Sequence, residues 1–397
     1  MGTAAAPVRR HNGSRIGGRE RFSARIQQDK TLGSSPLRGS IHTYNVCFLG
    51  FGNVNRTLVR LLRERAGELR DRYGTLFRIT GIASRRLGWL ADLKGLDSYG
   101  AGGLDFSTVA TPAGVSQHSD IRNWLAAAQA DVLFEATSLN VETGQPAVDS
   151  IQAALEHGAH AITANKGPIV HAYRELRDLA RSKGKRFLFE STVMDGVPVF
   201  SLFDELPGVH LEGFHGILNS TTNVILSQME EGLTFDQALT KAQELGVAET
   251  DATHDLDGWD AAVKTAAVIT VLMDTPIRLD QIRREGIGDL TPQAVRTARR
   301  DGWAFKLVCR GRRTPMGVEA SVAPEKVLST QPMARINGTS SYIYFETDIF
   351  PGLAITEENP GLYATAYGMF ADFIRAASCH ATQNHSPSPG TGLKGGS

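Results

Sequence analysis

A dense group of carboxylates precedes one lysine in residues 246–264, GVAETDATHDLDGWDAAVK. Asp260 and Lys264 are four residues apart, so on a helix they share one face, with Cβ atoms about 6 Å apart. The residues that follow, TAAVITVLM, are almost all apolar, which places the lysine at the edge of a core or over a cleft. Burial lowers the pKa of a lysine and a nearby carboxylate raises it, a balance suited to holding a proton near a reacting oxygen.

The same residues also have a purely structural interpretation. Asp257 fits a helix N-cap, and Asp260, three residues later, fits the acidic partner of a capping box. An exposed pair between Asp260 and Lys264 would then add less than about 1 kcal/mol of stability. The rest of the chain has to decide between these two interpretations.

A strand, a glycine turn and a helix are expected at the start of the folded region. Residues 44–49 (YNVCFL) are apolar and rich in strand formers, and GFGNVN and a helical pattern follow. This order is typical of a dinucleotide-binding turn, where one glycine makes the turn and the next lets the backbone approach the pyrophosphate. The predicted cofactor-binding residues of this turn are Gly50, Phe51, Gly52, Asn53 and Val54. Asn55 stands where the third glycine of the fingerprint belongs, so the fingerprint is incomplete.

A second strand, residues 77–83, ends in Ser84, Arg85 and Arg86. An acidic residue at this place binds the ribose hydroxyls of NAD, whereas an arginine can pair with the 2′-phosphate of NADP. Arg85 therefore favours NADP, with NAD as the alternative cofactor if these arginines are solvated loop residues.

Helices and strands then alternate up to residue 189, which predicts a Rossmann-like, doubly wound parallel sheet. Helices are expected over 119–130, 146–157 and 168–183, and strands over 132–136, 159–163 and 186–189. Ligands of open α/β sheets bind beyond the carboxyl ends of the strands. Thr137, Ser138 and Lys166 follow such strand ends and are predicted to face the nucleotide.

The pattern changes after residue 190 to alternating strands and amphipathic helices, which predicts an inserted α+β domain for substrate binding and dimerisation. The expected organisation is a disordered tail at 1–40, a nucleotide-binding domain at 41–190, the inserted domain at 191–350, a helix returning to the nucleotide domain at 351–377, and a tail at 378–397.

Composition excludes several classes of protein. Lys+Arg and Asp+Glu both number 42, and this balance argues against nucleic acid or an anionic membrane as a partner. The three cysteines are far apart, which fits a reducing cytoplasm better than a disulfide framework. No apolar run reaches the length of a membrane span. The arginine-rich first forty residues leave an organelle transit peptide open as an alternative.

Six motifs in order along the folded region resemble those of homoserine dehydrogenases. They are GFGNVN, TANKGP, ESTVMDGVP, GILNSTTNVIL, LGVAETDATHDLDGWDAAVK and NPGLYATAYG. The resemblance implies an NAD(P)-dependent, reversible interconversion of L-homoserine and L-aspartate 4-semialdehyde, serving threonine, methionine and isoleucine synthesis. It also implies a homodimer and a small-molecule substrate.

The resemblance also assigns roles to residues of this sequence. Lys264 and Lys166 resemble the catalytic lysines that flank the reacting oxygen, and Gly361 matches a position near the cofactor. Glu249 and Asp260, with Asp255 in support, resemble the residues that hold the amino end of the substrate.

A monovalent cation, typically sodium, is implied near the turn after the last parallel strand. The matching positions are Glu190, Val193, Asp195 and Val197. Two stretches depart from the family pattern: Asp195 stands where small residues are usual, and EENPG at 357–361 replaces a glycine-rich stretch.

Two other functions fit the same motifs less well. A related oxidoreductase would turn over other aldehydes and not homoserine. A nucleotide-binding protein without catalysis would not need paired lysines at the nicotinamide end of the cofactor.

Overall fold

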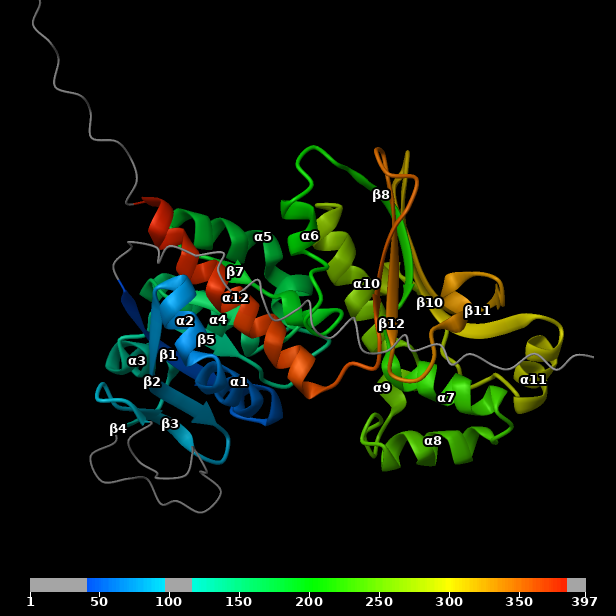
Figure 1. Ribbon diagram of the computed structural model, residues 1–397, viewed down its shortest axis with the longest axis horizontal. Helices are drawn as coiled ribbons and strands as arrows, with labels where there is room; N and C mark the ends of the chain where they lie inside the picture. The colour runs from blue at the N-terminus through cyan, green and yellow to red at the C-terminus, as the bar shows by residue number, and fades with distance from the viewer. Residues whose placement is uncertain (1–40, 97–115, 384–397) are drawn as a thin grey trace, which may run out of the picture. The chain divides into compact units, whose positions relative to one another are not determined.

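The computed structural model describes residues 41–96 and 116–383, which all belong to one compact unit of the chain (Figure 1). The predicted tail at 1–40 lies outside the described residues, and so does the end of the predicted tail at 378–397. The last helix, α12 (Leu362–Gln383), continues past the predicted boundary at residue 377.

A mostly parallel sheet forms the first half, with the strand order β4-β3-β2-β1-β5-β6-β7 in the described residues. Its strands are β1 (His42–Leu49), β2 (Thr75–Ser84), β3 (Gly88–Ala91), β4 (Ser116–His118), β5 (Val132–Glu135), β6 (His160–Thr163) and β7 (Phe187–Leu188). Five strands run parallel, namely β2, β1, β5, β6 and β7, whereas β3 and β4 add an antiparallel edge. The chain leaves β1 toward β2 on one side and reaches β5 on the other, so the strand order reverses beside β1, where nucleotides bind in such sheets.

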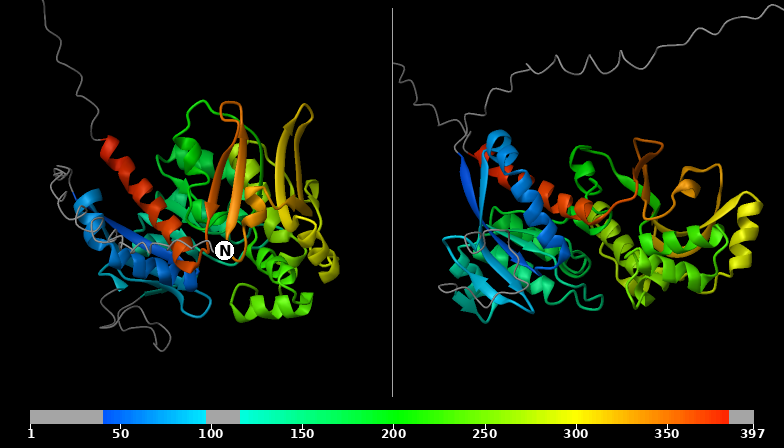
Figure 2. Two further views of the ribbon diagram at one scale, coloured as in Figure 1. Left: turned by 45° about the vertical axis from the view of Figure 1, so that its right-hand side comes forward. Right: turned by 60° about the horizontal axis from the view of Figure 1, so that its bottom comes forward.

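Helices cover both faces of this sheet, which confirms the doubly wound architecture. Neighbouring residues of β1 point to opposite faces: Cys47 packs with the α3, α4 and α5 layer, and Phe48 packs with α1 and α12. The helices are α1 (Asn53–Glu64), α2 (Ala66–Tyr73), α3 (Ile121–Ala128), α4 (Ala147–His157) and α5 (Gly167–Ser182). In both views of Figure 2, α12 lies along α1. The Tyr44 hydroxyl donates to the Ala377 carbonyl at 3.3 Å, so the C-terminal half of α12 packs against β1.

A second sheet, with the order β13-β12-β8-β10-β11-β9, forms the other half of the described fold. Its strands are β8 (Leu211–Ile217), β9 (Arg283–Arg284), β10 (Trp303–Thr314), β11 (Gly317–Leu328), β12 (Ser341–Thr347) and β13 (Leu353–Glu357). The pairs are antiparallel except that β9 runs parallel to β11. The remaining helices are α6 (Ser201–Asp204), α7 (Ser220–Glu230), α8 (Phe235–Glu244), α9 (Thr253–Leu256), α10 (Trp259–Leu272) and α11 (Pro292–Arg300). Among the described residues, no helix combines the length and apolar character that a membrane crossing requires.

Lys306 on β10 is fully buried, and its ammonium joins three parts of the second half. It donates to Asn223 Oδ1 at 3.1 Å, to the Ile336 carbonyl at 2.5 Å and to Asn337 Oδ1 at 3.0 Å. Burial lowers the pKa of this lysine to about 8. Three acceptors from α7 and a loop therefore depend on one side chain.

We expect Lys306→Met to lower the free energy of unfolding by about 2–4 kcal/mol, because it fills the same space but leaves buried acceptors without a donor. Urea unfolding followed by circular dichroism measures the change. Lys241→Met on the exposed side of α8 is the control and should stay within about 0.5 kcal/mol of the wild type. Equal stability of the two variants would contradict the prediction.

Candidate active site

The glycine turn after β1 has the geometry of a phosphate-binding turn. Gly50 has φ +77°, and a Cβ there would lie 2.5 Å from the Ala136 carbonyl oxygen, so a side chain is excluded. A Cβ at Gly52 would meet no atom within 4 Å, which leaves open space where a pyrophosphate would approach. Asn55 is fully buried, and its amide donates to the carbonyls of Leu49 at 3.0 Å and Gly50 at 3.1 Å. The residue that replaces the third glycine therefore fixes the turn.

A cleft of about 520 Å³ opens beside this turn. It is lined by Leu49, Gly50, Phe51, Gly52, Arg56, Ala83, Ser84, Arg85, Arg86, Trp89, Ala136, Thr137, Ser138, Pro146 and Ser150. The structure thus brings together the sequence-predicted Gly50, Phe51, Gly52, Arg85, Thr137 and Ser138. Asn53 and Val54 form the first turn of α1 next to them. None of the described residues that line this cleft carries a carboxylate, while three carry a guanidinium.

A buried carboxylate that the sequence did not single out organises the strand ends beneath this cleft. Glu135, the last residue of β5, accepts from the Thr137 backbone N–H at 2.7 Å and from the hydroxyls of Thr137 and Thr163 at 2.5 Å each. Burial raises the pKa of Glu135. The ends of β5 and β6 are thereby held together at the edge where the ligand is expected.

Asn165 continues this network to Lys166. Its side-chain oxygen accepts the Gly167 N–H at 2.9 Å, and its amide donates to the Thr137 carbonyl at 3.3 Å. Lys166 lies between them as the residue immediately before α5. The direction of this lysine is therefore set by hydrogen bonds on both sides of it.

The two predicted lysines converge on a single carboxylate. Lys166 Nζ lies 3.2 Å from Asp260 Oδ1, and Lys264 Nζ lies 3.2 Å from Asp260 Oδ2. Lys264 also donates to the Leu218 carbonyl at 2.6 Å. The side chains are 18–21 % exposed, so all three are largely shielded yet still open to a ligand. The spatial requirement of the catalytic interpretation is met, since Asp260 holds both ammonium groups in one place.

Electrostatics keep Asp260 and Lys264 charged at neutral pH. Burial alone would raise the pKa of Asp260, but the ammonium groups of Lys166 and Lys264 outweigh it and hold that pKa well below its usual range. Burial alone would lower the pKa of Lys264, but Asp260, with Asp195 and Asp255, outweighs it and raises that pKa. Lys264 is therefore a proton donor or a fixed cation rather than a base.

Asn219, which the sequence analysis did not single out, joins the carboxylates of the acidic segment. Its amide donates to Asp255 Oδ1 at 2.7 Å and to Asp260 Oδ2 at 3.1 Å, and its oxygen caps α7 by accepting the Thr222 N–H at 2.9 Å. Burial, and then repulsion from Asp260, raise the pKa of Asp255. The negative charge of Asp255 would therefore be stabilised by a cationic ligand.

The capping interpretation of the acidic segment is wrong. Helix α10 begins at Trp259 after Gly258, which has φ +78°, and no side chain caps it. A left-handed residue is needed at this position, where glycine is favoured, and this displaces Asp257 from the cap. Asp260 is consequently free to lie between the lysines.

Comparison with known proteins assigns the chain to one family. Residues 198–374 match the family described as "Homoserine dehydrogenase", and residues 50–190 match "Homoserine dehydrogenase, NAD binding domain". An NAD(+)-dependent homoserine dehydrogenase of Pseudomonas canavaninivorans is 33% identical over 335 residues, which cover 83% of this chain and 95% of the relative. The chain belongs to the homoserine dehydrogenase family. It is thus an NAD(P)-dependent oxidoreductase, and the resemblance seen in its motifs is confirmed.

Further homoserine dehydrogenases agree in sequence and in structure. That of Methanocaldococcus jannaschii is 32% identical, with 83% of this chain and 97% of the relative covered. The crystal structure of a putative homoserine dehydrogenase from Archaeoglobus fulgidus superimposes with a TM-score of 0.71 at 28% identity, over 83% of this chain and 98% of that one. The crystal structure of a homoserine dehydrogenase from Thiobacillus denitrificans superimposes with a TM-score of 0.73 at 27% identity, over 88% of this chain and 77% of that one.

Two residues carried over from the homoserine dehydrogenase motifs lie apart from the charged group. Glu249 is exposed, and within residues 41–96 and 116–383 no hydrogen bond or ion pair joins its side chain to the lysines. Gly361 immediately precedes α12, and its carbonyl accepts the Ala364 N–H at 2.8 Å. Their roles toward substrate and cofactor stay predictions.

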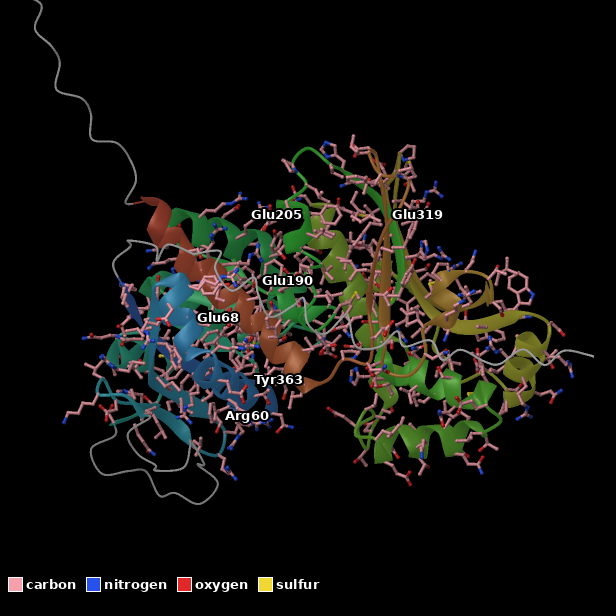
Figure 3. The ribbon with its side chains drawn as sticks, in the orientation of Figure 1. Arg60, Glu68, Glu190, Glu205, Glu319 and Tyr363 are labelled. Carbon is pink, nitrogen blue, oxygen red and sulfur yellow. The ribbon has the colours of Figure 1, made fainter. Side chains whose placement is uncertain are left out.

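The turn that would hold a cation in a homoserine dehydrogenase has most of its side-chain oxygens engaged. Glu190, labelled in Figure 3, accepts the backbone N–H groups of Phe200 at 2.7 Å and Ser201 at 3.0 Å, and Arg375 lies 3.5 Å away. Asp195 has φ +45°, a conformation that aspartate tolerates, and it accepts the Thr365 hydroxyl at 2.5 Å. Main-chain carbonyls are therefore the oxygens that this turn offers.

The two departures from the family pattern meet in space. Burial and repulsion from Asp195 raise the pKa of Glu357 to about 7, while Lys264 opposes this shift. Glu357 ends β13 and accepts the Ser341 hydroxyl at 3.2 Å. Two carboxylates that the family pattern does not include thus lie within electrostatic range of Lys264.

Proposed function

We propose that this chain catalyses the reversible, NADP-linked interconversion of L-homoserine and L-aspartate 4-semialdehyde. The observation that carries the proposal is the convergence of Lys166 and Lys264 on Asp260, beyond the strand ends that border the nucleotide cleft. The reaction would supply threonine, methionine and isoleucine synthesis, as the family resemblance implies.

The two lysines and the nearby carboxylates have different roles in the proposed reaction. A bound nicotinamide supplies the hydride chemistry. Lys264 and Lys166 stabilise the negative charge that develops on the carbonyl oxygen, and Lys264 donates the proton during reduction. Asp260 holds both ammonium groups near that oxygen. Glu249 and Asp260, with Asp255 in support, are assigned to the ammonium of the substrate, and this second cation would relieve the repulsion that Asp255 experiences from Asp260.

Absorbance at 340 nm tests this function directly. Purified enzyme with NADP and L-homoserine should produce NADPH, and L-serine in place of homoserine should not. Binding of NADP without turnover would instead support a nucleotide-binding protein without catalysis. Turnover of other aldehydes, with none of homoserine or its semialdehyde, would support a related oxidoreductase.

Cofactor preference is proposed to rest on Arg85, which lines the nucleotide cleft together with Arg56 and Arg86. A cleft lined by guanidinium groups and lacking a carboxylate in its described lining suits a 2′-phosphate better than a free ribose hydroxyl. The NAD(+)-dependent relative from Pseudomonas canavaninivorans makes NAD the competing cofactor.

We expect Arg85→Asp to shift the ratio of kcat/KM for NADP over NAD toward NAD by about 10–100-fold, since it removes a phosphate partner and adds a ribose acceptor. Initial rates with both cofactors measure the ratio. Lys94→Asp, exposed beyond β3, is the matched control and should leave it unchanged. An unchanged ratio in Arg85→Asp would show that this arginine does not bind the phosphate.

We infer that any monovalent cation at the turn after β7, such as sodium, is held by the main-chain carbonyls of Glu190, Val193, Asp195 and Val197. Hard cations favour such oxygens, and the Glu190 carboxylate is already engaged by two N–H groups. The Val197 carbonyl already accepts the Val199 N–H at 2.8 Å, which leaves it one lone pair. Activity in sodium chloride, compared with choline chloride at equal ionic strength, tests this site.

A homodimer and a cytoplasmic location complete the proposal. One face of the second sheet packs on α7 and α10, while the half-buried His215 and Tyr344 stack at 4.8 Å on the other. A second copy could cover that face, and sedimentation velocity would detect it.

Cys47 and Cys309 are buried and unpaired, and burial raises the pKa values of their thiols to about 12 and 11, so neither suits a disulfide.

A further inference from the structure

A second cavity, of about 350 Å³, lies at the open edge of the parallel sheet. It is bounded by β7, the C-terminal half of α5, α6 and the last turn of α10, with Arg375 of α12 at its side. The nucleotide cleft lies beside β1 and β5, whereas β7 is the last strand of the sheet. The two cavities share no lining residue.

The lining of this edge cavity is strongly cationic. Its five cationic side chains and two carboxylates are Arg177, Arg181, Lys185, Arg186, Arg375, Glu190 and Asp204. Arg375 is neutralised by Glu190, Asp204 and Asp372. In the described part of the chain, neither Arg181 nor Lys185 has an ion-pair partner. Positive charge is thus left over at one side of the cavity.

Aromatic rings form the floor beneath these charges. Phe189 contacts Phe187 at 5.1 Å, Phe200 at 5.0 Å and Tyr173 at 5.7 Å between ring centroids. Phe187, Phe189 and Phe200 remain 8–9 % exposed, so a small part of each ring faces the cavity. Phe187 lies in β7 and Phe189 follows that strand, and the contact between their rings places both on the same side of the sheet edge. A solvated helix end would account for the basic residues but not for this uncovered aromatic floor.

We propose that this edge cavity is a second ligand site, for a small organic anion with an aromatic or apolar body. The rings would take the body, and Arg181 and Lys185 would pair with the anionic group. A volume of about 350 Å³ is at the lower end of the range for small-molecule sites, which limits the ligand to roughly a dozen non-hydrogen atoms.

The edge cavity is well separated from Lys166 and Lys264 along α5 and α10, so its role can be tested independently of the catalytic group. Lys166 precedes α5 and Arg177 lies eleven residues later, beyond the irregular backbone at Ala172, so about three helical turns separate them. Likewise Lys264 lies in the N-terminal half of α10, and Val271 and Leu272, which line the cavity, end it. Substitutions at Arg181 and Lys185 should therefore leave the active site intact.

The test uses 3-phenylpropionate as the probe, titrated into the full-length protein by isothermal calorimetry with saturating NADP, and separately NAD, to occupy the nucleotide cleft. We expect saturable one-to-one binding with a Kd on the order of 1 mM that weakens as salt is raised. Phenethylamine, with the opposite charge, and propionate, without the ring, should bind at least tenfold more weakly.

Charge reversal locates the binding. The double variant Arg181→Glu with Lys185→Glu should weaken 3-phenylpropionate binding at least tenfold, while circular dichroism and turnover stay at the wild-type level. Lys183→Glu, exposed on the same segment but outside the lining, is the matched control and should bind within twofold of the wild type. Absence of saturable binding, or equal binding by wild type and double variant, would overturn the proposal.

Discussion

Replacing Lys264 with alanine should lower kcat by about 10²–10⁴-fold while the protein stays folded. In the proposed mechanism this lysine supplies one of the two positive charges at the reacting oxygen, and Asp260 raises its pKa so that it holds its proton at neutral pH. The variant also leaves Asp260 paired with Lys166, so this carboxylate keeps one cation. Steady-state rates in both directions, with circular dichroism for the fold, measure the effect.

Lys166→Ala should lose a comparable part of the rate, because its ammonium meets the same carboxylate from the other side. Lys241→Ala, exposed on α8, is the control and should retain wild-type kcat. The two lysines act as a unit, so the double variant should lose less than the product of the single losses. Wild-type activity in either single variant would remove that lysine from the mechanism.

Asp260→Asn should lower kcat/KM by about 10²–10³-fold and move the pH profile. Without this carboxylate, two ammonium groups face each other with less compensation, and burial lowers the pKa of Lys264. The proton donor is then lost at a lower pH, so the alkaline limb of the reduction rate should shift toward acid. Rates of semialdehyde reduction from pH 6 to pH 10 measure the shift.

For Asp260→Asn we also predict how the loss of folding stability depends on pH. The pKa of Asp260 is lower in the fold than in the unfolded chain, so its contribution is complete above its ordinary pKa and is lost as the pH falls through the folded value. Asp260→Asn should therefore be less stable than the wild type at pH 7, and the difference should shrink in acid. Asp257→Asn, exposed in the same motif, is the control. In the rate measurements, an alkaline limb of semialdehyde reduction that lies at the same pH in Asp260→Asn as in the wild type would show that Asp260 does not set the pKa of Lys264.

The part of the site that lies in short sequence intervals could be predicted, and the part that depends on packing could not. The spacing of Asp260 and Lys264 indicates one helix face, and Lys166 follows a strand end, so both lysines could be placed near the cofactor. Glu135 and Asn219 carry no such signal, because their partners are distant in the sequence. A polar residue at each strand or helix end would have been the available clue.

The fold was predictable to a similar extent. The parallel strands and their helices follow from periodicity, whereas β13 was missed because its five residues precede an irregular, charged turn. The helix boundary at Asp257 failed since the left-handed Gly258 changes the direction of the chain immediately before α10.

Asp260 also ties together two parts of the chain that fold from different sequence regions. Its partner Lys166 belongs to the nucleotide-binding sheet layer, and α5 packs on α10 at that contact. In the proposed mechanism, activity therefore requires α5 and α10 to be packed together. A mild denaturant concentration that loosens the packing of α5 on α10 should abolish turnover while most of the secondary structure persists. Inactivation would then precede global unfolding.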